Sequence, residues 1–483
     1  MRIYLLIHYN LGICYLRSKK DLGKAIGYLE KAIEHISKKH NAFAYEERNA
    51  PISAHFELGK AYQLTNKLDE ATSQFRKCIA LLPKRNLLQE ELSRHIEMCE
   101  FAKSQMANRL NVKISNLGEK INSTYSDFGP ILNTDESIMA FTSNRLGSTG
   151  QEIAKNGNYY NDIYISNSDG HFWSDPQNIN GKINSKFNDV AAGLSSDGQQ
   201  LFLFNDQTGY SYLYQSNFFN GEWSPIEFIN ENMKDSSLES HSSISLDGSL
   251  LYFASSREGG YGGTDIYRCR KLPNGAWAKA ENLGPKINTK HDEISPYIHP
   301  NGSILFFSSK GHQNLGGFDI FSSEIDENQE LATPKNIGYP VNTTGDESYY
   351  VLNAEGRRAY FSSTKPGGLG NEDIYVAEFF DYEKIAVTIL KGTITIKDQG
   401  DSEAQAEILV YDNADLSSPP GIFKPNSSTG KYVIVLKPGR DYKIEYLLND
   451  LIVKTDHIFV LEESVYQEIE KSVIMEPIEL DAE

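Results

Sequence analysis

The sequence has 483 residues and a formal net charge of -18, and a chain of this length is expected to form two to four domains of about 150 residues each. The acidic balance argues against non-specific binding to nucleic acid or anionic lipid, because both require clustered Lys and Arg. The charge is uneven, since residues 1–110 are net positive by roughly six.

Cysteine usage and hydropathy exclude further classes of protein. The cysteines are Cys14, Cys78, Cys99 and Cys269. None belongs to a CxxC pair and no histidine cluster lies nearby at metal-ligand spacing, so we expect no zinc site, no redox site and no cofactor. No apolar run reaches the ~20 residues that span a bilayer. Met1–Cys14 is apolar like a signal peptide, but His8 and Asn10 interrupt it and no small-residue cleavage site follows. We expect this segment to be helical, with no visible export signal.

Residues 1–110 show helical periodicity. Two similar stretches lie within this range. In the second, Ile52–Pro83, the residues that recur at helical spacing are Leu58, Gly59, Tyr62, Ala71, Phe75, Cys78 and Pro83. This ladder, with a period of ~34 residues, is similar to the tetratricopeptide repeat, a pair of antiparallel helices. Leu11, Gly12 and Tyr15 begin an earlier copy, and Leu87–Leu110 is expected to form a capping helix. Since such stacks usually need three or more repeats, we expect further repeat material upstream.

Ligand peptides of tetratricopeptide repeats lie along the concave face that the first helix of each pair forms. The repeat pattern assigns to this face Tyr9, Ile13, Arg17, Ser53, Phe56, Lys60 and Gln63. An exposed aromatic and basic strip there suits a partner helix or an acidic tail. The alternative is that Tyr9 and Ile13 pack against a preceding repeat.

One phrase recurs through residues 111–383. Its fullest copy is SSREGGYGGTDIY at Ser255–Tyr267, and the other copies are Ser143–Tyr164, Ser308–Phe321 and Ser362–Tyr375. Each follows an Asn/Asp-Gly type of turn and an alternating apolar run, at a period of roughly 50 residues, which predicts a β-propeller. Turn signals indicate five blades, and an Asn-Leu-Gly phrase lies between them. That phrase is missing after the last blade, so we expect the strand near Asn111–Leu117 to close the ring.

In four blades the recurring phrase has a basic residue near its start and an Asp near its end. These residues are Arg145, Asp162, Arg257, Asp265, Lys310, Asp319, Lys365 and Asp373. Blade two has Gln207 and Tyr212 instead, and a joint change is typical of two groups that pair. We expect a structural ion pair that braces the Gly-rich loop. The alternative is a ring at the channel mouth that binds an acidic or carbohydrate ligand.

A second acidic series precedes the first strand of each blade. It consists of Asp127, Asp189, Glu239, Glu293 and Glu347. Some five-bladed propellers are glycosidases, which use two carboxylates about 5 to 9 Å apart. Catalytic residues are unique within a chain, whereas these carboxylates are periodic, so we expect them to be scaffold residues and the protein not to be an enzyme.

Residues 384–475 carry short alternating strands separated by Gly, Pro and Asp, which predicts a small β-sandwich. The tail Tyr466–Glu483 is expected to supply a final strand, with residues 476–483 as the start of a linker. The predicted fold class is therefore multidomain α plus all-β: helical repeats over 1–110, a five-bladed propeller closed by an N-terminal strand over 111–383, and the sandwich.

This order of parts resembles the multidomain OmpA-family envelope proteins of Bacteroidetes, in which tetratricopeptide repeats precede a WD40-like, TolB-type propeller and a carboxypeptidase-regulatory-like sandwich. The member that it most resembles is a component of the type IX secretion system. The resemblance implies a periplasmic, outer-membrane-associated protein. It also implies peptidoglycan binding through a C-terminal OmpA-like domain, which we do not recognise in this sequence.

Two classes of function follow from these observations. The first is a non-enzymatic envelope scaffold whose helical repeats and propeller dock protein partners, with no transmembrane segment and no nucleic acid bound. The alternative is a carbohydrate-active or glycan-binding propeller protein. An enzyme requires one deep, asymmetric pocket lined by carboxylates, whereas a scaffold shows a quasi-symmetric ring.

Overall fold

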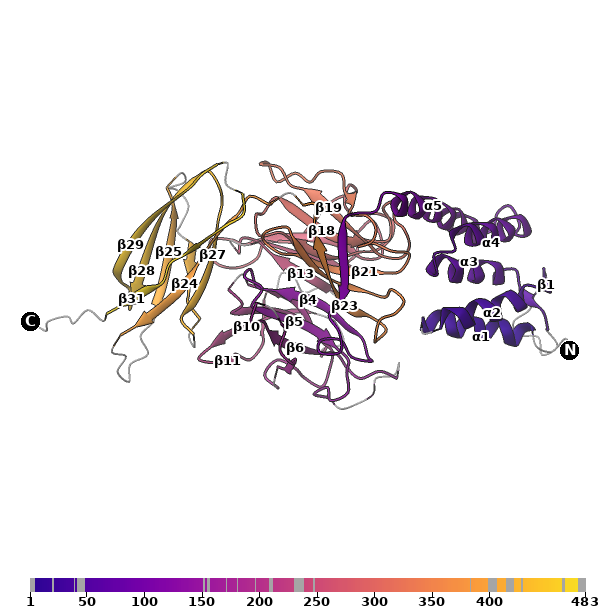
Figure 1. The fold of residues 1–483 in the computed structure, drawn as a ribbon, viewed down its shortest axis with the longest axis horizontal. Helices are drawn as coiled ribbons and strands as arrows, with labels where there is room; N and C mark the ends of the chain where they lie inside the picture. The colour runs from indigo at the N-terminus through magenta and orange to yellow at the C-terminus, as the bar shows by residue number, and fades with distance from the viewer. Residues whose placement is uncertain are drawn as a thin grey trace, which may run out of the picture.

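The computed structural model describes residues 5–19, 21–38, 40, 48–150, 153, 157–170, 172–179, 181–195, 197–207, 212–229, 239–245, 248–382, 384–397, 406–413, 421–426, 429–462 and 465–476. Figure 1 shows a row of three parts, with helices at one end, a propeller in the middle and a sandwich at the other end. This arrangement confirms the predicted multidomain α plus all-β fold class. Among the described residues, no helix is both long enough and apolar enough to cross a membrane.

Five helices form the first part. They are α1 (Leu5–Ser18), α2 (Leu22–Ala32), α3 (Ala54–Leu64), α4 (Leu68–Leu81) and α5 (Leu88–Ala107). The short strands β1 (Ile36–Ser37) and β2 (Ala50–Pro51) pair in parallel between α2 and α3. The helices pack as antiparallel pairs, α1 with α2 and α3 with α4, and α5 then covers α4.

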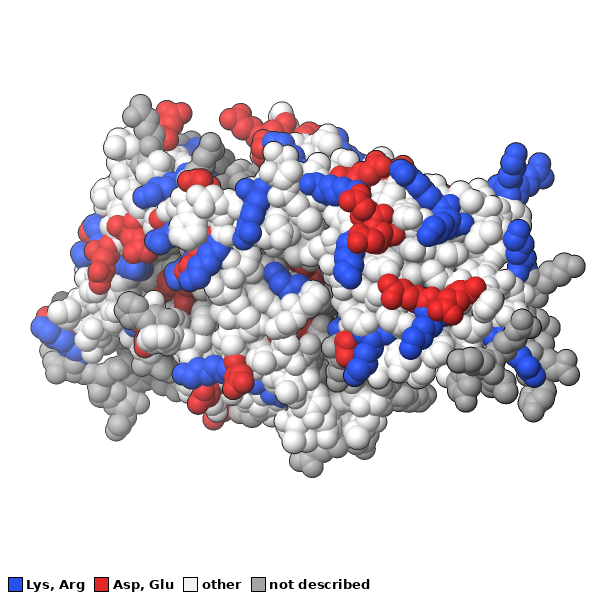
Figure 2. Space-filling view, turned by 45° about the vertical axis from the view of Figure 1, so that its right-hand side comes forward, with Lys and Arg blue, Asp and Glu red and all other residues white. Residues whose placement is uncertain are grey.

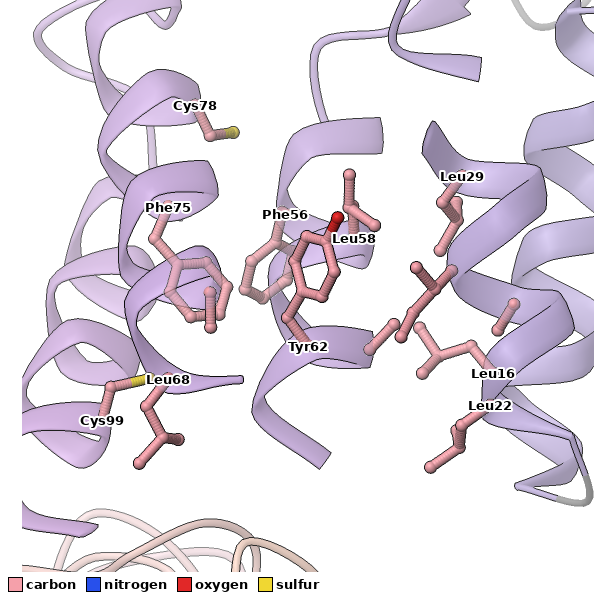
Figure 3. Close-up of a cluster of buried hydrophobic side chains, with 14 of the residues drawn as sticks. Leu16, Leu22, Leu29, Phe56, Leu58, Tyr62, Leu68, Phe75, Cys78 and Cys99 are labelled. Carbon is pink, nitrogen blue, oxygen red and sulfur yellow. The ribbon is translucent and has the colours of Figure 1, made fainter. Parts of the chain in front are cut away.

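Glycine permits the close packing within each helical pair. A Cβ atom on Gly12 would lie 2.6 Å from Leu29 Cγ, and one on Gly59 would lie 2.6 Å from Phe75 Cδ1. The two glycines hold the same position in successive pairs, so the pairs are built alike. Figure 3 shows the core between the pairs, where Leu16 and Leu29 face Leu58 and Tyr62.

The propeller consists of five antiparallel sheets. Blade one comprises β4 (Asp127–Leu132), β5 (Ile138–Ser143), β6 (Asp162–Asn167) and β7 (Gln177–Asn178). Blade two comprises β8 (Asp189–Leu194), β9 (Gln200–Asn205), β10 (Tyr212–Phe219), β11 (Glu222–Trp223) and β12 (Glu227–Phe228). Blade three comprises β13 (Glu239–Ile244), β14 (Leu250–Ser255), β15 (Asp265–Arg270) and β16 (Glu281–Asn282). Blade four comprises β17 (Glu293–Ile298), β18 (Ile304–Ser309), β19 (Asp319–Glu324) and β20 (Lys335–Asn336).

The fifth blade joins the two ends of the propeller. It contains β21 (Glu347–Leu352), β22 (Arg358–Ser363), β23 (Asp373–Phe379) and β3 (Val112–Asn116) from the N-terminal side. Tyr375 to Phe379 pair with Asn116 to Val112 in antiparallel register. The predicted closure by an N-terminal strand is therefore confirmed, and it pairs the strand edge that blade five would otherwise leave open.

The C-terminal part contains two packed sheets. One comprises β24 (Thr388–Ile396), β27 (Lys431–Leu436), β30 (Gln467–Glu470) and β31 (Val473–Met475). The other comprises β25 (Ala406–Asp412), β26 (Gly421–Phe423), β28 (Arg440–Leu448) and β29 (Leu451–Val460). Tyr432 and Tyr446, one from each sheet, are fully buried between them. The tail supplies two short strands, both parallel to β24. Residues 477–483 of the expected linker lie outside the described residues.

Candidate docking sites

The residues assigned to the concave helical face divide into two groups. In the first pair Tyr9 and Ile13 are half-buried and Arg17 is exposed. In the second pair Ser53 and Lys60 are half-buried, whereas Phe56 and Gln63 are 5% and 3% exposed. The expectation of an exposed strip is therefore wrong for Phe56 and Gln63.

Helix α5 covers this part of the concave face. The His95 ring lies 5.2 Å from the Phe56 ring and 5.1 Å from the Phe75 ring. His95 Nδ1 is 2.7 Å from Gln63 Oε1, and burial lowers the pKa of His95 to about 3, so the ring is neutral and donates to the amide oxygen. His95 of the capping helix therefore covers Phe56 and Gln63.

The propeller also contributes to the helical core, through a loop of blade four. Leu315 is fully buried among the helical residues, and Gln63 Nε2 donates to the Leu315 carbonyl oxygen at 3.3 Å. Met98 of α5 contacts the same amide group. The sequence of the blade phrase could not predict this role. Blade five has a leucine, Leu369, at the equivalent position, yet that side chain is 39% exposed, so a leucine at this position does not by itself indicate burial.

Lys19, the residue after α1, reaches the loops of blade five that precede β21 and follow β22. Lys19 Nζ donates to Asp346 Oδ2 at 2.7 Å and to Thr364 Oγ1 at 3.0 Å. Burial raises the pKa of Asp346, but the Lys19 ammonium, the Phe318 N–H group and the Lys310 charge together hold it below its usual value. Burial, together with the nearby Asp346 charge, raises the pKa of Glu372 to about 7. An ion pair thus joins the helical part to blade five.

The aspartates of the recurring phrase organise the Gly-rich loops. Asp265 accepts hydrogen bonds from the backbone N–H groups of Tyr261 and Gly262, at 2.6 and 3.0 Å. Asn282, from the Asn-Leu-Gly phrase, donates its amide to the same carboxylate at 2.8 Å. Asp162, Asp319 and Asp373 accept equivalent bonds from a loop N–H and from Asn178, Asn336 and Asn116. The two sequence phrases are therefore joined by one hydrogen-bond network.

The basic residues of the phrase have other partners than the expected aspartates. Arg145 donates to Asp127 and to the Ile121 carbonyl oxygen, and its guanidinium lies 4.8 Å from the Tyr164 ring. The Arg257 guanidinium lies 4.8 Å from the Tyr267 ring. Lys310 pairs with Asp292 at 3.1 Å, and the Lys365 ammonium lies 4.4 Å from the Tyr375 ring. The expected ion pair between the basic residue and the aspartate of the same phrase is therefore wrong. Asp162, for example, accepts its hydrogen bonds from Thr149 and Asn178.

The four described side chains of the second acidic series hold the turn before their blades. Glu293 accepts from Thr289 N and Oγ1 at 2.7 and 2.8 Å and from Ser309 Oγ at 2.6 Å. Asp127, Asp189 and Glu347 bind Ser123, Ser185 and Thr343 in the same way. Burial raises the pKa of Asp189 to about 6, against the effect of these hydrogen bonds. The Glu239 side chain lies outside the described residues.

The propeller channel is narrowed at its middle and hollow at the sandwich end. Tyr349 of blade five and His241 of blade three are in hydrogen-bond contact there, and the Phe128 ring lies 5.6 Å from the Tyr349 ring. A cavity of about 820 Å³ lies between the blade turns and the sandwich, lined among others by Asn133, Ser242, Tyr252, Tyr297, Tyr360 and Phe423. Sequence reasoning missed both features, because the recurring turns that line the cavity predict the blades but not the space between the blades and the sandwich, and the recurring phrases do not include Tyr349 or His241.

No group of three or more His, Cys, Asp or Glu side chains arranged to hold a metal ion occurs in the part of the chain that the structure describes. Cys14 is exposed, whereas Cys78, Cys99 and Cys269 are buried free thiols. Figure 2 shows basic and acidic side chains interspersed over one face of the molecule.

Comparison with known proteins identifies the helical repeat. A family described as tetratricopeptide repeat matches residues 52–84, which confirms the predicted second helical pair. No curated protein sequence matches the chain.

Several solved structures are similar to about half of this chain. TolB from Acinetobacter baumannii is 15% identical over 54% of this chain and 56% of that chain, with a TM-score of 0.31. A putative TolB from Agrobacterium tumefaciens is 13% identical over 56% of this chain and 98% of that chain, with a TM-score of 0.34. An endo-arabinase from Bacteroides thetaiotaomicron VPI-5482 is 12% identical over 55% of this chain and 99% of that chain, with a TM-score of 0.36. The chain thus combines tetratricopeptide-repeat helices with a β-propeller.

Proposed function

We propose that this protein is a non-enzymatic scaffold of the cell envelope that docks protein partners through its helical repeats and propeller. The observation that carries the proposal is the use of the periodic carboxylates. Asp162, Asp265, Asp319 and Asp373 bind loop N–H groups and asparagine amides. Carboxylates committed to holding the backbone are not available as the acid and base of a glycosidase.

The finer proposal follows the family resemblance. We place the protein in the periplasm, associated with the outer membrane, as part of a complex like the type IX secretion system. Its link to peptidoglycan is proposed to run through an OmpA-like domain, as in the family that it resembles. The tetratricopeptide repeat at residues 52–84 supports protein docking, because such helical repeats present extended surfaces to partners.

A second candidate is a glycan-binding or carbohydrate-active propeller. The cavity of about 820 Å³ between propeller and sandwich supports it, since its volume lies within the range of ligand sites and its lining combines aromatic rings with polar groups.

The two candidates are separated by a retention experiment with the immobilised chain. Envelope extract is passed over the full chain and over a chain that begins at Asn108, and each is also tested against purified peptidoglycan and soluble glycans. Envelope proteins retained by the full chain and lost from the shorter one support the scaffold. Retention or cleavage of glycans by both chains, without a protein partner, contradicts it and supports the second candidate.

A further inference from the structure

The cavity between the propeller and the sandwich is lined by two different parts of the chain. Its volume is about 820 Å³, and all five blades contribute to it through the turns between their first two strands. The sandwich contributes β26 together with residues at the ends of β25, β27 and β28. A ligand in this space would therefore contact the propeller and the sandwich at the same time.

The sandwich is attached to the propeller on two sides of the cavity. At blade five, Ala354 packs in an apolar cluster with Val387 and Ile389 of the sandwich. At blade two, Gln199 Nε2 donates to the Lys424 carbonyl oxygen at 2.8 Å. The sandwich wall of the cavity is thus held in place by two separate blades.

The charges in the lining are largely neutralised. The charged lining residues are Glu136, Asp197, Asp412, Lys437 and Arg440. Glu136 pairs with Arg358 at 3.0 Å, and Asp412 lies 3.7 Å from Arg440. The Asp197 carboxylate accepts hydrogen bonds from its own turn, and Lys437 is exposed to solvent. A charged ligand would lose hydration without gaining a buried counter-ion from the described lining. We therefore expect an uncharged ligand.

The lining offers ring surfaces and a hydroxyl group. Tyr297 of blade four and Phe423 of β26 lie on the two walls, and both are half-buried, so part of each ring is accessible. The Tyr297 hydroxyl group already donates to the Leu352 carbonyl oxygen at 2.8 Å. Ser242 also lines the cavity, and its buried hydroxyl group has no hydrogen-bond partner among the described residues. The ligand that fits combines apolar faces with hydrogen-bonding groups.

We propose that this cavity binds a neutral oligosaccharide, without cleaving it, between the propeller and the sandwich. A sugar ring has apolar C–H groups on its faces and hydroxyl groups around its edge, which matches a lining of rings and polar groups. Cleavage is not expected, because the lining carboxylates are bound to other protein groups and are not free to act as acid and base. The inference rests on the glycan-binding candidate above and names its ligand class and the two walls of its site.

The test uses the full chain and a set of trisaccharides as probes. The neutral probes are trimers of glucose, N-acetylglucosamine, mannose, xylose and arabinose, and the charged comparison is trigalacturonic acid. Calorimetry measures their affinity, and chromatography of the bound sugar detects cleavage. We expect at least one neutral trimer to bind and to be recovered intact. Its affinity should stay within twofold when the salt concentration is raised tenfold, and also in Lys437→Glu, because an uncharged ligand is not screened by salt.

A variant of the sandwich wall locates the site. Phe423→Ala removes an accessible ring and is expected to weaken binding of the neutral trimer at least tenfold. Phe219→Ala is the matched control, since Phe219 is 53% exposed in β10 outside the lining, and affinity should stay within twofold. Circular dichroism verifies the fold of both variants. If Phe423→Ala does not fold, hydrogen exchange of the unaltered chain decides, because a bound trimer should slow exchange at both Gly421–Phe423 and Ser242–Ser245.

The outcomes separate this inference from the broader glycan-binding candidate. Binding of trigalacturonic acid alone, or equal affinity of the neutral trimer for the Phe423→Ala and unaltered chains, contradicts the inference and leaves glycan binding intact. Cleavage of the trimer contradicts it as well and supports a carbohydrate-active protein. Binding of neither the neutral nor the charged trimers overturns both the inference and the glycan-binding candidate.

Discussion

Tyr349 and His241 meet across the propeller channel, where the Tyr349 hydroxyl group and His241 Nε2 form a hydrogen bond. Their rings are 4.4 Å apart between centroids, at a T-shaped angle of 70°. Both residues lie at β-bulges of inner strands and have positive φ values, 55° and 51°. Since blades three and five are not neighbours in the ring, this pair joins opposite sides of the channel.

Replacing Tyr349 by Phe should destabilise the propeller. The change leaves His241 Nε2 buried without its partner, and an unpaired buried polar group costs about 1–3 kcal/mol. Guanidinium unfolding followed by tyrosine and tryptophan fluorescence measures the effect. The control is Tyr261→Phe, since that ring is 52% exposed and a change of less than about 0.5 kcal/mol is expected there. Equal stability of the two variants would show that the pair contributes nothing.

Acid should destabilise the helical part through His95. Burial lowers the pKa of this ring to about 3, below its value near 6.5 in an unfolded chain. The unfolded state therefore binds more protons below pH 6.5, so stability is present at neutral pH and falls as the pH decreases from about 6.5 toward 3.

The measurement is the denaturation midpoint of helical circular dichroism at pH 7 and pH 5. In His95→Gln the decrease between the two pH values should be smaller than in the unaltered chain. His457→Gln, which changes an exposed histidine of β29, should leave the decrease as it is. An unchanged decrease in His95→Gln would contradict the assignment.

Much of the fold was predictable because it depends on repetition. Five copies of a turn and an apolar run predict five blades, and the missing phrase after the last blade predicts closure by Val112–Asn116. The Gly12 and Gly59 ladder predicts two helical pairs, since each glycine is close to a core side chain of the next helix.

The contacts between the parts were not predictable in this way. Phe56 and Gln63 fit the pattern of an exposed groove, yet α5 and the blade-four loop bury them. Leu315 and Leu369 occupy equivalent loop positions, and only the three-dimensional placement of the helices buries one and exposes the other. The predicted ion pair between the basic residue and the aspartate of each phrase was wrong for another reason. The joint change to Gln207 and Tyr212 in blade two indicates that the two positions depend on each other, but not that the two side chains are in contact.

Leu315 should hold the helical part against the propeller. Leu315→Ala removes a fully buried side chain from the helical core, and such truncations cost about 2–5 kcal/mol. We expect faster proteolysis near residues 108–111, which join the two parts. Leu369→Ala is the matched control, at the equivalent position of blade five and 39% exposed, and its cleavage rate should stay near that of the unaltered chain. Cleavage at the same rate in both variants would refute the contact.

Asp265 should be essential for the stability of blade three. Asp265→Ala leaves the N–H groups of Tyr261 and Gly262 and the Asn282 amide without their acceptor. Each lost charge-assisted bond is worth about 1.5–3 kcal/mol, so a loss of at least about 3 kcal/mol is expected. Thermal unfolding compares it with Glu258→Ala, an exposed carboxylate in the same loop, for which less than about 0.5 kcal/mol is expected. A midpoint for Asp265→Ala as high as that of Glu258→Ala would contradict the network.

Alanine at two helical glycines should have opposite effects. A Cβ atom on Gly59 would lie 2.6 Å from Phe75 Cδ1, within the core that separates α3 from α4. Overpacking of this kind costs about 1–3 kcal/mol. Gly27 lies in α2 with no atom within 4 Å of an added Cβ, so Gly27→Ala should instead stabilise that helix by about 0.5–1 kcal/mol. Denaturation followed by helical circular dichroism measures both changes against the unaltered chain. A gain in stability at both sites would mean that Gly59 is replaceable, and that the close approach of α3 and α4 does not depend on glycine.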